Sequence, residues 1–181
     1  MTAQTKTRTH ALDPIHSTAE FSVKHLMVST VKGRFRDLEG DLYIDEAEPT
    51  RSWVEATIKT ASVDTGVEMR DNDLRSENFF ESERFPTITF RSTGVERVDD
   101  EHWRVRGDLT IRDVIRKVVL DTEFEGRGPG FDGKERLGFS AETSINRKDF
   151  GLTFNQVLET GGVVVGDKVK ISIHVESVRL D

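Results

Sequence analysis

Two-residue alternation is the feature of this sequence that most constrains its fold. In one segment, Leu137, Phe139, Ala141, Thr143 and Ile145 occupy every second position, with small, polar or charged residues between them. Successive side chains of a β-strand point to opposite faces, so this spacing predicts a strand with one face turned to a core. Strands of this kind pair in antiparallel sheets that bury one side.

The same alternation recurs along most of the chain and predicts about eight strands joined by short turns. This pattern indicates an antiparallel sandwich or barrel. No repeat, linker or composition break divides the 181 residues, and a chain of this length forms a full core as one domain. We expect residues 1–9 to be a flexible N-terminal tail and residues 10–181 to be a single domain.

The positions expected to point inward include small residues that would leave the centre of a barrel unfilled. Ala56, Thr60, Ser92, Ala141 and Thr143 stand among the large apolar residues of these faces. An eight-stranded barrel has room for one small ligand when its inner side chains do not fill it. The pattern equally allows a sandwich core that contains ordinary small residues, so both interpretations stay open at this point.

The segment Met69–Ser92 interrupts the strands. Thr65 and Glu68 have the spacing of a capping box, which predicts a short helix capped by the Thr65 side chain. Phe79-Phe80 follows, and neither a one-sided strand nor an amphipathic helix hides two adjacent rings on the same side. The segment is therefore interpreted as a lid over a cavity or as a hydrophobic plug of an ordinary core.

Composition excludes several classes of protein. The chain has no cysteine, which excludes disulfides, thiolate metal sites and a cysteine nucleophile. Its net charge of −7 opposes general attraction to nucleic acid or to an anionic membrane, although a local basic patch remains compatible with it. Because no segment has the pattern of a signal peptide or a membrane span, we expect a cytoplasmic protein without stable membrane insertion.

No catalytic or metal motif stands out. The five histidines, at positions 10, 16, 25, 102 and 174, lack metal-site spacing, so we expect no metal. His16-Ser17 beside Asp13 lacks a nucleophile elbow and is interpreted as a local turn. Arg75 and Arg147 stand beside the expected lid segments, where they would meet an anionic head group or form solvated ion pairs. We therefore expect no catalytic residue.

Several short motifs occur in one order along the chain. They are Asp13-Pro-x-His-Ser17, Phe21-x-Val-x-His-Leu26, Gly33-x-Phe35, Arg70-Asp71 with Leu74-Arg-Ser76, Phe79-Phe80, Pro86 with Phe90-x-Ser92, Gly107-x-Leu-Thr-Ile111 and Arg147-x-Asp-Phe-Gly-Leu152. From about Leu12 to Leu180 this ordered set resembles the YceI-like family. The resemblance implies an all-β, lipocalin-like, eight-stranded antiparallel barrel with short helical segments near one end. It also implies an apolar tunnel that holds a polyisoprenoid, such as a quinone tail or a prenyl phosphate.

Two positions depart from the family pattern: Asp73 stands where a histidine is usual, and Asp113 where glycine is frequent. If Asp73 faces the tunnel mouth, its negative charge should disfavour a prenyl diphosphate relative to a neutral isoprenoid. The change at Asp113 should affect only a turn.

We therefore expect a non-enzymatic binder, carrier or store of a long-chain isoprenoid-like lipid, without a catalytic cofactor. The alternatives are an enzyme acting on such a lipid, with His16 or His25 as acid or base, and a purely structural barrel. A second copy of the chain is a further candidate partner, whereas nucleic acid is not expected. The expected head-group contacts are His16, His25, Arg75 and Arg147. The expected lipid-binding residues are Phe21, Val23, Phe35, Val54, Ala56, Ile58, Leu74, Phe79, Phe80, Ile88, Phe90, Phe139, Ala141 and Phe150.

Overall fold

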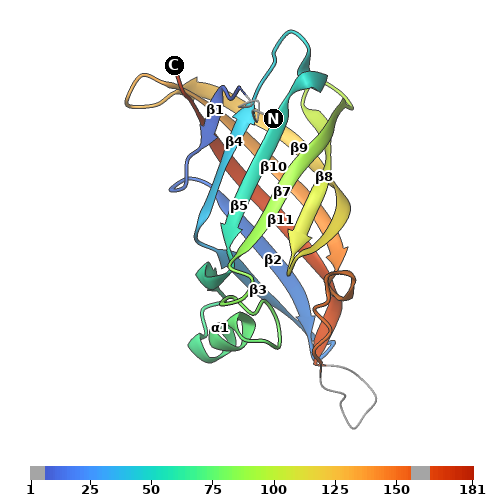
Figure 1. Cartoon of the computed structure of the whole chain (residues 1–181). Coiled ribbons are helices and arrows are strands. Elements are labelled where there is room, and N and C mark those ends of the chain that lie inside the picture. Colours follow the sequence, from blue (N-terminus) through green and yellow to red (C-terminus); the bar gives the residue numbers. More distant parts are fainter. Residues whose placement is uncertain (1–6, 156–163) are drawn as a thin grey trace, which may run out of the picture.

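The chain forms a closed wall of antiparallel strands (Figure 1). The computed structural model describes residues 7–155 and 164–181, so the expected tail at residues 1–9 lies largely outside the described residues. The strands are β1 (His10–Leu12), β2 (Thr18–His25), β3 (Ser29–Phe35), β4 (Leu38–Tyr43), β5 (Trp53–Lys59), β6 (Val63–Asp64), β7 (Thr87–Arg97), β8 (His102–Ile111), β9 (Val114–Pro129), β10 (Glu135–Asn146) and β11 (Val165–Arg179). The helical elements are α1 (Glu68–Arg75) and the 3-10 turns η1 (Pro49–Arg51), η2 (Thr60–Ser62) and η3 (Arg147–Phe150).

The barrel closes because the last strand pairs with the first. Neighbouring strands follow the order β1-β4-β5-β7-β8-β9-β10-β11, and β11 returns to β1. The other half of β11 pairs with β2, and β2 pairs with β3. Thus β1 with β2, and β3 with β4, are two interrupted strands in a ring of eight. The expected eight-stranded antiparallel barrel is confirmed.

Local sequence explains where the strands break and turn. Between β1 and β2, Pro14 has no N–H for a ladder, and the Asp13 carboxylate accepts from the Ile15 N–H at 2.9 Å, which forms a turn. Between β8 and β9, Arg112 and Asp113 have φ of 51° and 61°, the backbone of a two-residue hairpin turn. Asp113 therefore lies in a turn, as the sequence indicated.

The helical segments partly follow the sequence expectation. η3 begins after Asn146, whose side chain accepts from the Lys148 N–H at 3.0 Å. The predicted capping box is wrong, because α1 begins at Glu68 without a side-chain cap. The Thr65 N–H and hydroxyl instead donate to the Asp71 carboxylate at 2.8 and 2.6 Å. The Asp71 carboxylate, rather than Glu68, thus accepts from the Thr65 N–H, and the Thr65 hydroxyl donates to Asp71 instead of capping the helix.

Two buried clusters leave the centre of the barrel open. One cluster gathers at the α1 end of the barrel, and the smaller one consists of inward side chains of β1, β2 and β4. In Figure 1, α1 and the β2–β3 hairpin lie at one end, and the C-terminal end of β11 lies at the other. Within the described residues, no helix combines the length and the apolar character needed to cross a membrane.

Candidate ligand cavity

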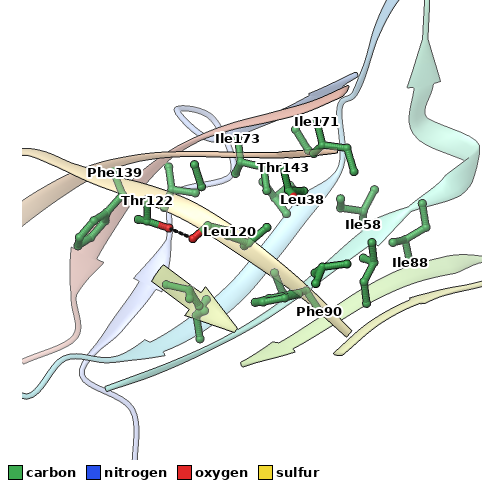
Figure 2. Close-up of a pocket in the computed structure, with 18 of the residues that line it drawn as sticks. Leu38, Ile58, Ile88, Phe90, Leu120, Thr122, Phe139, Thr143, Ile171 and Ile173 are labelled. Carbon is green, nitrogen blue, oxygen red and sulfur yellow. Dashed lines mark hydrogen bonds between the residues drawn. The ribbon is translucent and has the colours of Figure 1, made fainter. Parts of the chain in front are cut away.

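The inner faces of the strands enclose a cavity of about 620 Å³ (Figure 2). Side chains from opposite walls, such as Ile88 of β7 and Ile173 of β11, point into it. Even the threonine at position 122 offers little polarity, because its hydroxyl donates to the Leu120 carbonyl of its own strand at 3.1 Å. The interior is therefore suited to hydrocarbon.

Thirteen of the fourteen residues expected to bind lipid line this cavity. They are Phe21, Val23, Phe35, Val54, Ala56, Ile58, Leu74, Phe79, Phe80, Ile88, Phe90, Phe139 and Ala141. The remaining residue, Phe150, is 1% exposed and packs in the buried cluster at the α1 end, outside the lining. Two-residue alternation locates the strand positions, but η3 turns Phe150 away from the ladder and into that cluster.

The segment between α1 and β7 closes one end of the cavity. Leu74, Phe79 and Phe80 belong to the lining. The ring of Phe80 packs edge-on against Phe35 with centroids 5.5 Å apart, and Phe79 contacts Phe154 in the same way at 5.6 Å. The two adjacent rings noticed in the sequence thus cover the end of a cavity.

The opposite end forms a polar mouth, which consists of Asp45, Glu46, Ser52, Asp100 and Arg127 of the lining. Arg127 Nη2 lies 2.5 Å from Glu46 Oε1, and Arg127 Nη1 lies 3.7 Å from Glu135. The Glu46 carboxylate raises the pKa of Arg127 above its ordinary value. Arg127 belongs to β9, and Glu46 belongs to the loop after β4. In the ring of eight strands, β4 and β9 lie opposite each other, four strands apart in both directions. The ion pair therefore crosses the mouth from one wall to the opposite wall.

Arg147 lies at the α1 end and is 3% exposed. Its guanidinium donates to four main-chain carbonyls: Leu152 at 2.6 Å, Gly166 at 2.8 Å, Phe154 at 2.9 Å and Val165 at 3.3 Å. Burial lowers its pKa, and Asp167, 3.8 Å away, partly opposes that shift. The structure thus places Arg147 on the backbone that flanks η3 and β11, with its donors already engaged.

The other three residues expected at a head group lie outside the lining. Arg75 donates to the Ala61 and Val63 carbonyls at 2.8 and 3.2 Å, which fixes α1 to the preceding chain. His25 ends β2 and is half-buried, while the side chain of His16 is 61% exposed. Asp73 is exposed on α1 and accepts from Asn78 at 3.0 Å, so the hypothesis that it faces the mouth is not supported.

One cluster of potential metal ligands lies outside the barrel. Ligand atoms of Asp13, His16 and Glu176 fall within 4.8 Å of one another, an arrangement that histidine spacing alone could not reveal. His16 Nδ1 lies 2.8 Å from Asp13, and this hydrogen bond lowers the pKa of Asp13 and raises that of His16. Glu176 is also 3.3 Å from Arg136. An arginine beside the carboxylate competes with a cation there.

The sequence did not predict the charged residues of the polar mouth. Residues 127–133 contain three glycines and a proline, a composition typical of a loop, yet β9 continues to Pro129. Arg127 consequently occupies a strand position. Trp103 and Phe124, which also belong to the lining, follow the two-residue alternation and could have been found by extending it, whereas Trp53 lies next to the inward Val54 and breaks it.

Comparison with known proteins agrees with this architecture. The family model described as YceI-like domain matches residues 10–177. A UPF0312 protein of Staphylococcus epidermidis is 41% identical over 166 residues, which cover 91% of this chain and 94% of the relative. BcnA of Burkholderia cenocepacia superposes with a TM-score of 0.80 at 22% identity, covering 91% of this chain and 98% of BcnA. A structure described as a polyisoprenoid binding domain from Saccharophagus degradans superposes with a TM-score of 0.70 at 17% identity, covering 96% and 100%. On the sequence match and the shared barrel, the chain belongs to the YceI-like family.

Proposed function

We propose that this protein binds a long-chain isoprenoid lipid in its barrel, with the hydrocarbon tail in the cavity and the head group at the polar mouth. The cavity is the observation that supports this proposal: its walls are apolar, one end is closed by Phe79 and Phe80, and charged groups gather at the other. The description of the Saccharophagus degradans domain as polyisoprenoid binding points to the same class of ligand.

Energetics favour an occupied cavity. Roughly 24 cal/mol is lost per Å³ of empty apolar space. A cavity of about 620 Å³ that stays unfilled therefore carries a substantial cost. Each buried CH₂ contributes roughly 0.8 kcal/mol, so a few isoprene units offset a large part of that cost. A hydrocarbon ligand therefore stabilises the barrel without specific polar contacts along its tail.

We propose binding rather than catalysis. His16 and His25, the residues considered as acid or base, lie outside the cavity lining. Arg147, the charged side chain at the closed end, has its donors on main-chain carbonyls. The tail region therefore offers contact surface and no arranged pair of acid and base among the described residues.

The mouth favours a neutral head group over a phosphate. Asp45, Glu46 and Asp100 supply three carboxylates to the mouth; Asp100 is paired with Arg97, and Glu46 with Arg127 at 2.5 Å, which leaves Asp45 as the carboxylate without an arginine ion pair among the described residues. A phosphate would meet these carboxylates and would have to break the ion pair between Glu46 and Arg127. A quinone or an alcohol would meet hydrogen-bonding groups without the repulsion. We therefore propose a neutral isoprenoid, such as a quinone, as the preferred class of ligand.

Extraction of the purified protein with organic solvent, followed by mass spectrometry, tests the central proposal. We expect an isoprenoid lipid in near-stoichiometric amount. A delipidated sample should take up a prenyl alcohol and a prenylated quinone in a titration. Failure of every isoprenoid to bind would refute the proposal, and so would turnover of the added lipid that is lost in His16→Ala.

The Glu46→Gln variant tests the assignment of the head group to the mouth. Removing the carboxylate frees Arg127 and takes one negative charge from the opening, so affinity for a prenyl diphosphate should rise by about tenfold, as for a close charge pair. Affinity for the prenyl alcohol of equal length should stay the same. Glu39→Gln on the exposed face of β4 is the matched control. If Glu46→Gln and Glu39→Gln changed the affinity for the prenyl diphosphate equally, the head group would not lie at the mouth.

A further inference from the structure

The β2–β3 hairpin exposes three consecutive apolar side chains at its tip. Leu26 is 38% exposed, Met27 is 59% exposed and Val28 is 82% exposed. Leu26 and Met27 have φ of 52° and 61°, in the left-handed region where hairpin turns favour glycine, asparagine or aspartate. Both the exposure and the backbone geometry oppose large apolar residues here. Folding alone gives no reason for them at this place.

The position of the tip is well defined. The Leu26 N–H donates to the Val164 carbonyl at 2.9 Å, and the Val28 N–H donates to the His25 carbonyl at 3.1 Å. β2 pairs with β3 up to His25 and Ser29, so the three side chains project from the end of a regular ladder. Val67 and Met69 at the start of α1 are also exposed, and α1 lies at the same end of the barrel (Figure 1).

Four lysines lie on the outer face of the wall, on the strands that lead to the tip: Lys24, Lys32, Lys168 and Lys170. Ser22 pairs with Lys170 on one side and with Lys32 on the other, which places these two ammonium groups in one row. All four lysines are exposed, and none has a salt bridge to a carboxylate within residues 7–155 and 164–181.

Acidic residues near the lysines do not cancel this charge. Asp167 lies on the same strand, but its carboxylate is 3.4 Å from Lys148 and 3.8 Å from Arg147. A surface groove of about 590 Å³ beside the hairpin is lined by Lys32, Arg34 and Lys170 together with Glu20 and the Arg36–Asp64 ion pair. In a chain with a net charge of −7, this is a local basic surface.

We propose that the β2–β3 hairpin docks the protein on an anionic lipid bilayer. The apolar tip would enter the boundary between head groups and acyl chains, and the lysines and the groove would meet the lipid phosphates. Exposed apolar residues beside a cluster of basic ones are a combination that favours peripheral binding to anionic membranes. A protein partner that used this surface would need an acidic rim and an apolar pocket of its own. Leu26, Met27 and Val28 are outside the cavity lining, so docking and lipid binding can be tested separately.

Vesicle sedimentation with the full chain tests this proposal. We expect binding to phosphatidylcholine vesicles that contain phosphatidylglycerol, weaker binding to phosphatidylcholine alone, and a decrease with added salt. The double variant Met27→Asn, Val28→Ser should lose binding by about tenfold or more. Its asparagine suits the left-handed backbone, so the hairpin keeps its fold. Phe131→Ser, at the exposed tip of the β9–β10 hairpin, is the matched control and should change nothing.

A charge-reversed variant and a fluorescent one complete the test. Lys24→Glu, Lys170→Glu should abolish the preference for phosphatidylglycerol, and Met27→Trp should shift its fluorescence to the blue on those vesicles. Equal binding by the wild type and by Met27→Asn, Val28→Ser would overturn the proposal. The proposal would also be overturned if the tip were buried against a second copy of the chain or against another protein instead of against lipid. Uptake of a prenyl alcohol should be unchanged in all these variants, which separates this proposal from that of the cavity.

Discussion

His10 is a buried ionisable side chain at the seam where β1 meets both β4 and β11. It is 4% exposed; its Nδ1 lies 2.8 Å from the Thr9 hydroxyl, and its Nε2 has no hydrogen-bond partner within the described residues. Burial lowers the pKa of His10, and Arg179 lowers it further, against smaller opposing effects of Glu135, Asp181 and Glu46. The folded barrel therefore holds this imidazole neutral.

Acidification should destabilise the seam through His10. Because its folded pKa lies below the unfolded value of about 6.5, the unfolded chain binds the proton more readily, and stability falls as pH drops through 6.5 toward the folded pKa. Urea unfolding between about pH 7.5 and 5.5 should show this fall, and His10→Gln should flatten it. Carboxylates with lowered pKa act at more acidic pH and contribute little in this window.

His16 and His102 provide the control for this measurement. Hydrogen bonds to Asp13 and Asp99 raise the pKa of these two exposed histidines, so their contributions are present at low pH and are lost as pH rises. Replacing both with glutamine should leave the fall on acidification as large or larger. A flat profile in that double variant would contradict the role given to His10.

Among the elements, the segment that closes the cavity depends on the hairpin between β8 and β9. Arg112 Nη2 lies 3.2 Å from the Glu81 carboxylate, and Nη1 donates to the Gly151 carbonyl at 3.2 Å. The guanidinium also lies 5.5 Å from the centre of the Phe85 ring. One side chain thus joins the turn, the closing segment and the end of η3.

Arg112→Asn should loosen the closing segment while it keeps the turn, because asparagine tolerates the left-handed backbone at this position. The partly buried ion pair contributes about 1 kcal/mol, so the global loss of stability should be small. Amide hydrogen exchange of residues 76–86 should accelerate severalfold, because a loss of about 1 kcal/mol lowers the free energy of local opening of this segment.

Arg116→Asn is the matched control, since Arg116 is exposed and its Nη1 donates only to the Ile115 carbonyl in the described structure. Exchange of residues 76–86 should be unchanged in that variant. Equal protection of these amides in Arg112→Asn and wild type would show that the aromatic contacts alone hold the segment.

At the scale of the whole molecule, the barrel is a container whose inner side chains decide what fits. Ala56 and Ala141 lie on the cavity wall. Ala141→Trp should reduce lipid uptake by about tenfold or more, because the indole occupies ligand space. Unfolding of the delipidated variant should change by less than about 1 kcal/mol, whereas the same substitution in a close-packed core costs typically 1–3 kcal/mol.

Ser144→Trp, on the exposed side of the same strand, is the control and should leave lipid uptake intact. Ala56→Trp should behave like Ala141→Trp from the opposite region of the wall. A loss of stability in the two inward variants without a loss of uptake by the folded protein would mean that the cavity is not the lipid site.

Sequence alone determined the features that depend on neighbours along the chain. The alternation at residues 137–145 sorts each side chain to the inner or outer face of β10, and the structure has Phe139 and Ala141 on the inside. Asn146 caps the next turn, and Arg112-Asp113 reverses the chain. Phe79-Phe80 marked the closed end, because two adjacent rings must cover something. Strand period, turn geometry and local capping suffice for these features.

Only the tertiary structure decided what the two ends of the cavity present. Glu46 and Arg127 are 81 positions apart, and they meet because closure of the barrel brings opposite walls together at the mouth. Arg147 was expected at a head group, yet four carbonyls from residues 152–166 surround it once β11 joins the ring. The Thr65 hydroxyl, expected to cap the helix, instead donates to the Asp71 carboxylate, a charged and therefore strong acceptor. Local pattern assigns a side chain to the inner or outer face of its strand. Its partner across the barrel depends instead on how the strands close into a ring. For this reason the sequence predicted the walls of the cavity but not its mouth.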